Sequence, residues 1–143
     1  MGVALNALFD GCERVIVFDA SGEVLGTGGQ GTGSVTRDEL RATAAVFEDR
    51  DAAMSSGVVL EGQRYEVHRW HPPCVYGRTT TERSEDSVGF AVCRVASRSC
   101  EPARLVLATY AFPRLSARVV PELVEFAQHF LGLPEPVWEG LKY

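Results

Sequence analysis

The segment 60–94 decides the fold. It reads LEGQRYEVHRW over 60–70, CVYGR over 74–78 and, after a polar stretch, VGFAVCR over 88–94. In its first part, Tyr65 and Val67 alternate with long polar side chains, and this period of two is typical of a half-buried antiparallel strand. If the neighbouring strands share the pattern, one polar face of the sheet carries a row of basic side chains. We expect that row to hold Arg64, His68, Arg78 and Arg94.

The size and composition of the chain predict a single folded domain. It has 143 residues, of which 45% are hydrophobic and 23% are charged, and a chain of this kind buries a sizeable core. We expect the domain to span residues 1–133. The remaining segment, 134–143, is expected to be a docked extension because it keeps apolar residues such as Trp138. The net charge of −5 argues against general binding to nucleic acid, which requires a basic surface.

The sequence also predicts a cytoplasmic protein that does not span a membrane. No apolar run approaches the ~20 residues of a membrane-spanning helix. The first residues, Met1–Phe9, lack the basic flank and cleavage site of a signal peptide. Four cysteines are present without a C-x-x-C pair or the spacing of zinc ligands. In a reducing compartment we expect them to be small buried side chains or free thiols.

Turn residues and a capping box predict the helices and strands in the first third of the chain. The expected elements before residue 35 are a short helix at 4–9, strands at 15–18 and 23–25 that form a hairpin, and a glycine-rich loop at 26–34. Thr36 and Glu39 have the spacing of a capping box, which predicts a helix over 37–47.

A meander of about five strands is expected over 57–111, including the most hydrophobic strand at 103–111. The last helix is expected to begin at Pro121, since proline suits a first helical turn, and to end at Gly132. This order of elements predicts an α+β fold in which helices pack on a mostly antiparallel sheet.

Two apparent motifs do not indicate a ligand site. The run GTGGQG at 26–31 formally matches a dinucleotide-binding loop, but that motif requires a parallel βαβ unit whose helix begins at the loop. His68, His71 and Cys74 are spaced three apart, yet residues three apart on a strand point to opposite faces, and no fourth metal ligand is evident. We therefore expect a flexible loop, no metal site and no cofactor.

The sequence offers no positive sign of an enzyme. Cys74 and Cys93 could act as nucleophiles, but cysteines on strands are usually inert core residues. No serine lies in a G-x-S-x-G elbow. The remaining candidates are Arg69, Arg78, Arg94 and Arg118, and their guanidinium groups suit bidentate pairing with carboxylates or phosphates. They favour a surface that binds an anionic partner over a merely solvated sheet face.

The sequence resembles the profilin family over about residues 12–131. The middle of a profilin is similar to Gly62–Tyr65, Arg69, Val75–Arg78, Gly89 and Arg94, and the similarity continues into 15–22 on one side and 105–123 on the other. The resemblance implies a profilin-like antiparallel sheet of seven strands. It further implies that N- and C-terminal helices lie on one side of this sheet and another helix on the other.

The resemblance also implies a function. A profilin binds monomeric actin, regulates its polymerisation and nucleotide exchange in the cytoplasm and cytoskeleton, and responds to phosphoinositides. Carried over to this sequence, the actin-binding residues would be Arg69, Val75, Arg78, Arg94, Arg118 and Glu122.

The chain departs from the family pattern at the surface that binds proline-rich proteins. A profilin uses tryptophan and tyrosine there, whereas the corresponding positions of this chain hold Leu5, Phe9, Leu25, Phe126 and Phe130. These side chains supply apolar area but no hydrogen bond to the ligand, so poly-proline binding is doubtful. Insertions at 79–87 and 97–102 leave open an alternative, in which the chain is a profilin-like or roadblock/longin-like interaction scaffold that does not bind actin.

Overall fold

The computed structural model describes residues 12–83, 86–95, 103–111 and 116–127. The short helix expected at 4–9 and the extension 134–143 lie outside this range. The described elements, in chain order, are β1 (Arg14–Asp19), β2 (Val24–Gly29), α2 (Arg37–Ala45), α3 (Arg50–Ser56), β3 (Val58–Leu60), β4 (Gln63–His71), β5 (Cys74–Arg78), β6 (Val88–Val95), β7 (Arg104–Ala111) and α4 (Ser116–Phe126).

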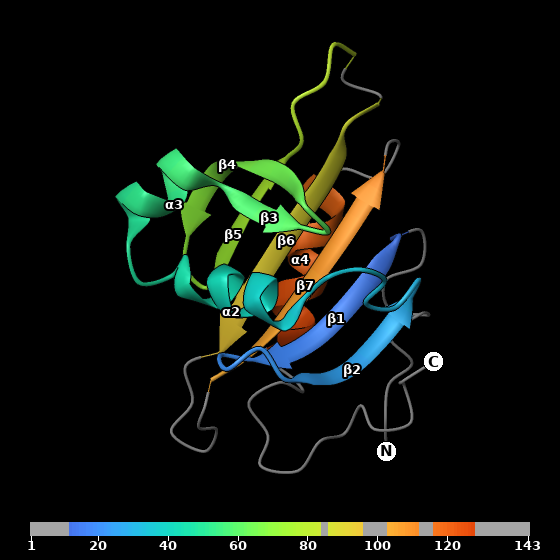
Figure 1. Ribbon diagram of the computed structural model, residues 1–143, viewed down its shortest axis with the longest axis vertical. Helices are drawn as coiled ribbons and strands as arrows, with labels where there is room; N and C mark the ends of the chain where they lie inside the picture. Colours follow the sequence, from blue (N-terminus) through green and yellow to red (C-terminus); the bar gives the residue numbers. More distant parts are fainter. Residues whose placement is uncertain (1–11, 84–85, 96–102, 112–115, 128–143) are drawn as a thin grey trace.

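The seven strands form one sheet in the order β2-β1-β7-β6-β5-β4-β3. Each pair of neighbours is antiparallel. Helices α2 and α3 lie over one face of the sheet and α4 lies over the other (Figure 1). The α+β fold, the hairpin and the five-stranded meander predicted from the sequence are confirmed. We call the two sides of the sheet the α2–α3 face and the α4 face.

Two apolar layers hold the helices to the sheet. On the α4 face, strand residues such as Val17, Ala91 and Tyr110 pack against Val119 and Leu123 of α4. The layer on the α2–α3 face is formed from the alternate strand positions, together with residues of the two helices and the turn between them; its members include Ile16, Phe18, Leu40, Phe47, Phe90 and Leu107. Alternation along each strand therefore divides the side chains between two cores.

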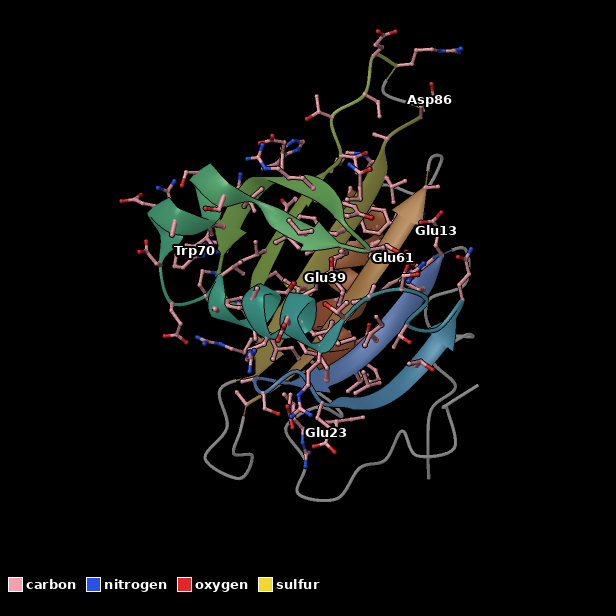
Figure 2. All side chains as sticks on the ribbon, viewed as in Figure 1. Glu13, Glu23, Glu39, Glu61, Trp70 and Asp86 are labelled. Atoms are coloured by element: carbon pink, nitrogen blue, oxygen red, sulfur yellow. The ribbon has the colours of Figure 1, made fainter. Side chains whose placement is uncertain are left out.

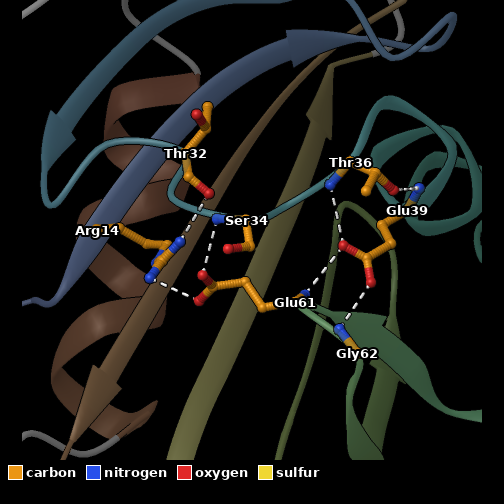
Figure 3. Close-up of polar contacts among 7 residues, drawn as sticks. All are labelled: Arg14, Thr32, Ser34, Thr36, Glu39, Glu61 and Gly62. Atoms are coloured by element: carbon orange, nitrogen blue, oxygen red, sulfur yellow. Dashed lines mark hydrogen bonds and ion pairs between the residues drawn. The ribbon is translucent and has the colours of Figure 1, made fainter.

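The sheet is curled toward the α2–α3 face. Strand β1 is separated from β3 by four intervening strands, which in a flat sheet would correspond to roughly 24 Å. Nevertheless, Arg14 at the start of β1 forms an ion pair of 2.7 Å with Glu61, in the turn between β3 and β4. The curl brings this turn back across the face to the first strand (Figure 3).

A set of polar contacts holds the β3–β4 turn against the first strand and helix α2. Arg14 also donates to the carbonyl of Thr32 at 2.8 Å, and Glu61 accepts from the amide of Ser34 at 2.9 Å. The Glu39 carboxylate accepts the amides of Glu61 and Gly62, each at 2.9 Å. Helix α2, the loop before it and the β3–β4 turn are thus tied to one another, as Figure 3 shows. We call this set of contacts the latch.

The capping box predicted at Thr36 and Glu39 is confirmed. The Glu39 amide donates to the Thr36 hydroxyl at 3.1 Å, and the Thr36 amide donates to the Glu39 carboxylate at 3.0 Å. Burial raises the pKa of Glu39, but the amides of Gly62, Thr36 and Glu61 outweigh burial and hold the pKa below its ordinary value of 4.5. This carboxylate therefore serves both the helix and the latch.

Two expected boundaries were wrong, and one helix was not expected. Strand β2 continues to Gly29, so the glycine-rich segment begins as a strand rather than as a loop at residue 26. The chain forms a second helix, α3, after Asp49 caps it by accepting the amide of Ala52 at 3.1 Å. Helix α4 begins at Ser116, and Pro121 lies inside it.

Candidate functional site

A β-bulge in β4 places Arg69 on the α4 face of the sheet. Val67 is paired with Gly77, but Arg69 is paired with Tyr76, so His68 is an extra residue that forms a bulge. Strict alternation from Tyr65 and Val67 would turn Arg69 into the core of the α2–α3 face. The bulge instead places Arg69 beside Tyr76, whose ring packs against the core of the α4 face.

The same bulge turns Trp70 inward. Trp70 is paired with Val75 and packs against the core of the α2–α3 face. Its indole Nε1 donates to the carbonyl of Val46, after α2, at 2.8 Å, and Figure 2 shows Trp70 beside the helices. One extra residue thus exchanges an arginine and a tryptophan between the two faces.

Gly77 is required opposite the bulge. A Cβ atom at Gly77 would collide with the backbone carbonyl of Glu66 on β4. This glycine is part of the CVYGR segment, and glycine within a strand is a recognised sign of a bulge or of a close approach of another chain segment. Once the partner strand is known, this glycine is the signal in the sequence that points to the bulge.

Arg78 is held in place on the α4 face. Its Nε donates to the hydroxyl of Ser87 at 2.8 Å, and its guanidinium carbon lies 5.7 Å from the centre of the Tyr110 ring. The ring lies across Gly89, where a Cβ atom would collide with it. Tyr110 is itself fixed by donating to the carbonyl of Phe90 at 3.2 Å. Arg78 is thus pre-organised at the base of the β5–β6 connection, whose described parts project beyond the sheet (Figures 1 and 2).

The prediction of one row of four basic side chains was wrong. Arg94 alternates with Phe90 and Val92 and lies on the α2–α3 face, where it forms an ion pair of 3.0 Å with Glu48 and lies 4.9 Å from the centre of the Phe47 ring. Its position on β6 is five residues from Gly89, the partner of Arg78, or roughly 17 Å along a strand. Arg94 and Arg78 therefore occupy opposite faces and different ends of the sheet.

The other two members of that row are also separated. Arg64 donates to the carbonyls of Ser55 and Ser56 at the end of α3 and pairs with Glu66 at 2.9 Å. His68 is the bulged residue and is exposed. Alternation within one strand was predicted correctly, but it does not fix the faces of residues on different strands.

Of the six residues expected to bind actin, four lie on the α4 side of the sheet. Arg69 and Arg78 belong to β4 and β5, while Arg118 and Glu122 belong to α4, which packs against β5, β6 and β7. Arg69 and Arg118 are exposed. Val75 is not available to a partner, because its side chain is 0% exposed and lies in the core beneath α2 and α3.

The residues expected at a poly-proline surface are largely core residues or lie outside the described structure. Phe126 is 1% exposed and belongs to the core of the α4 face. Leu25 is half-buried and packs against the same core. Leu5, Phe9 and Phe130 fall on residues that the structure does not describe. The two described positions thus pack the domain and offer no aromatic platform.

The motifs that the sequence analysis set aside have structural explanations. Strands β1 and β2 are antiparallel, whereas a dinucleotide loop requires a parallel unit. Cys74 and Cys93 are buried free thiols. Among the described residues, no three His, Cys, Asp or Glu side chains are grouped so that they could hold a metal ion.

A shallow hollow lies between α2 and β3. It is mainly apolar and is lined by Asp38, Glu39, Ala42, Thr43, Ser56, Gly57, Val58 and Val59. Val59 is 42% exposed, and β3 is an edge strand of only three residues. The hollow lies on the side of the molecule opposite the four residues of the α4 face.

Comparison with solved structures shows which fold this is. A Schizosaccharomyces pombe profilin matches with a TM-score of 0.63 and 19% identity over 82% of this chain and 83% of that one. Acanthamoeba castellanii profilin IA matches with a TM-score of 0.68 and 15% identity over 87% and 91% of the two chains. The chain has the profilin fold.

A third similar structure is a complex of two proteins. It is the LokiProfilin2/rabbit actin complex, which matches with a TM-score of 0.64 and 10% identity over 90% of this chain and 91% of that one. No protein-family model matches the sequence, and no curated protein matches it. Among these comparisons, the similarity to profilins is therefore found in the three-dimensional structure alone. Within the described residues, no helix combines the length and the apolar character needed to cross a membrane.

Proposed function

We propose that this protein binds monomeric actin through its α4 face and thereby regulates actin polymerisation. The observation that carries the proposal is the placement of Arg69, Arg78 and Arg118 on the same side of a profilin fold, which is also the side of Glu122 on α4. A solved structure with this fold is a complex with actin. Arginines of this kind suit a carboxylate-bearing protein surface because the guanidinium fork pairs with carboxylates in a fixed geometry.

The proposed mechanism is differential binding. A partner that binds one conformation of actin more tightly shifts the population toward it, so preference for an opened monomer would speed nucleotide exchange. The protein would act in the cytoplasm, beside the cytoskeleton. The same arginines could bind phosphoinositide phosphates, which would then compete with actin for the α4 face. Strong binding to poly-proline is not part of the proposal, because Phe126 is buried and Leu25 offers no hydrogen bond.

The test compares charge reversals on the two sides of the sheet. We expect Arg69→Glu combined with Arg118→Glu to weaken binding to monomeric actin roughly tenfold or more, which corresponds to about 1.4 kcal/mol. Binding is measured by calorimetry, and pyrene-actin polymerisation reports the functional effect. Arg50→Glu is the control on the other side of the sheet, because Arg50 is an exposed arginine of α3 and its reversal should leave binding unchanged.

A second candidate function is a scaffold that uses the profilin fold to bind a different protein. It is favoured by the finding that Val75 is buried and Arg94 lies on the α2–α3 face, so that two of the six residues expected to bind actin lie away from the other four. Absence of any effect of the wild-type protein on actin, even in high molar excess, would reject the first function and leave this one. Equal losses from the α4-face and Arg50 variants would reject the proposed site.

A further inference from the structure

Cys74 and Cys93 face each other on adjacent strands. Cys74 is the first residue of β5, Cys93 lies near the end of β6, and the two are direct partners in the register of this pair. Residues directly opposite in an antiparallel pair point to the same face of the sheet. Both side chains belong to the core of the α4 face, beneath helix α4.

The backbone hydrogen bonds identify the type of pairing. The amide of Arg94 donates to the carbonyl of Pro73 at 2.9 Å, so the bonded position lies one residue outside the two cysteines. Cys74 and Cys93 therefore occupy a non-hydrogen-bonded pair, in which the Cα atoms are about 4.5 Å apart and side chains approach most closely. A disulfide bond spans Cα separations of about 4.4–6.8 Å. The pairing of the two strands therefore holds the Cα atoms of Cys74 and Cys93 at a separation that a disulfide bond can span.

The two thiols are chemically unequal. A hydrogen bond from Cys93 lowers the pKa of Cys74 despite its burial. The same hydrogen bond, together with burial, raises the pKa of Cys93. Cys74 is 4% exposed and follows the exposed residues Pro72 and Pro73, whereas Cys93 is 0% exposed. Cys74 is thus the thiol that ionises more readily and the one closer to solvent.

We propose that Cys74 and Cys93 form a reversible cross-strand disulfide bond when the protein meets hydrogen peroxide. Peroxide is small enough to reach a thiol at the edge of a core. The proposal concerns a modification site on β5 and β6, and it holds whether or not the α4 face binds actin.

The chemistry takes two steps. The Cys74 thiolate attacks one peroxide oxygen, the O–O bond breaks, and hydroxide leaves, which gives a sulfenic acid on Cys74. The sulfur of Cys93 then attacks the Cys74 sulfur, the S–O bond breaks, and the departing hydroxyl leaves as water with the proton of Cys93. In total, two thiols lose two electrons to one peroxide molecule, and two water molecules are formed. A dithiol such as dithiothreitol reverses the bond by exchange.

The bond would close a covalent ring that contains the β5–β6 connection. Such a ring stabilises the fold mainly by restricting the unfolded chain. Because the ring ties the two strands that α4 packs against, oxidation is expected to raise the unfolding temperature of the domain without changing its fold.

The first experiment maps the bond directly. Trypsin cleaves after Arg69, Arg78, Arg83 and Arg94, so the two cysteines fall in separate peptides, 70–78 and 84–94. The folded full-length protein is treated with hydrogen peroxide, its remaining thiols are alkylated after unfolding, and the digest is analysed by mass spectrometry without reduction. We expect the two peptides to be joined, to separate on addition of dithiothreitol, and the oxidised protein to unfold at a higher temperature than the reduced protein.

Variants test the order of the two steps. Cys93→Ala should stop the reaction at a sulfenic acid on Cys74, which dimedone traps, whereas Cys74→Ala should leave Cys93 unreacted. Cys12→Ser is the control and should still form the bond. Circular dichroism confirms that each variant is folded. The proposal is overturned if Cys74 and Cys93 are both alkylated after peroxide treatment of the wild type, or if either cysteine is found joined to a different one.

Discussion

At the residue scale, the Glu39 side chain joins two separate parts of the chain. Its carboxylate accepts the amides of Thr36, Glu61 and Gly62, from two separate parts of the chain. A glutamine at this position would keep the shape but lose the charge and one acceptor oxygen. We expect Glu39→Gln to lower the free energy of unfolding by about 1–2 kcal/mol, measured by urea denaturation at pH 7.

The same residue predicts a dependence on pH. Because the folded-state pKa of Glu39 lies below its ordinary value of 4.5, the unfolded chain binds the proton more tightly. The contribution of Glu39 to stability is therefore complete above pH 4.5 and is lost as the pH falls through the lower, folded-state pKa. The stability difference between the wild type and Glu39→Gln should shrink in this acidic range. A difference that stays constant down to the lowest pH at which both proteins fold would contradict this assignment.

Thr109 offers the opposite test, in which removing a polar group is favourable. Its side chain is 2% exposed, and within the described part of the chain its hydroxyl has no hydrogen-bond partner. Valine has the same shape without the hydroxyl. We expect Thr109→Val to raise the free energy of unfolding by about 1 kcal/mol, seen as a higher urea midpoint with an unchanged slope. A lower midpoint would mean that the hydroxyl is paired in solution.

At the element scale, Pro121 makes α4 a weaker helix than it could be. Proline has no amide, so the carbonyl of Ala117 lacks the helical hydrogen bond that residue 121 would normally donate. Because Pro121 is exposed, its replacement costs no core packing. We expect Pro121→Ala to stabilise the domain by about 1–2 kcal/mol after the loss of chain stiffness is included. Thermal unfolding followed by circular dichroism measures this, with the exposed Ala117→Ser change in the same helix as a control.

The elements were easier to predict from the sequence than the faces they present. The capping box at Thr36 and the alternation of Tyr65 with Val67 each depend on residues that are close together in the sequence. The structure confirms both. Helix α3 was missed because its short run, RDAAMSS, has little apolar periodicity. The start of α4 was misplaced because Pro121 suits a first helical turn better than a helix interior.

The candidate site was harder to predict because it depends on register between strands. Arg78 and Arg94 both lie on strands of alternating pattern, yet pairing across β5 and β6 sends them to opposite faces. Arg69 lies on the α4 face because of a bulge, and the strand propensities of the residues in β4 do not predict that bulge. Gly77, which makes room for that bulge, is a signal that becomes readable once the partner strand is known.

At the scale of the whole molecule, the latch keeps the sheet curled. Arg14 has only 9% of its side chain exposed, and its counter-charge is Glu61. A glutamine at position 61 keeps one acceptor oxygen but leaves a largely buried guanidinium without its counter-charge. We expect Glu61→Gln to cost about 2 kcal/mol, less than for a fully buried pair because Glu61 is about one-third exposed.

A double-mutant cycle isolates the pair. Arg14→Met alone leaves Glu61 able to turn toward water, so it should cost less than Glu61→Gln. The double variant Arg14→Met, Glu61→Gln should be more stable than the sum of the two single changes predicts. Strict additivity in urea unfolding would show that the ion pair adds nothing to the closure.

The bulge at His68 has a consequence for how such a protein changes during evolution. A point substitution alters one side chain, but deletion of this single residue would shift the register of the rest of β4 by one position. Each later side chain of the strand would then point to the other face of the sheet. Arg69 would then be driven into the apolar layer and Trp70 onto the outer surface. A loss of one codon could therefore erase a binding surface that many separate substitutions would only weaken. Lineages that keep the surface should show few length changes between Tyr65 and Gly77, even where their side chains have diverged.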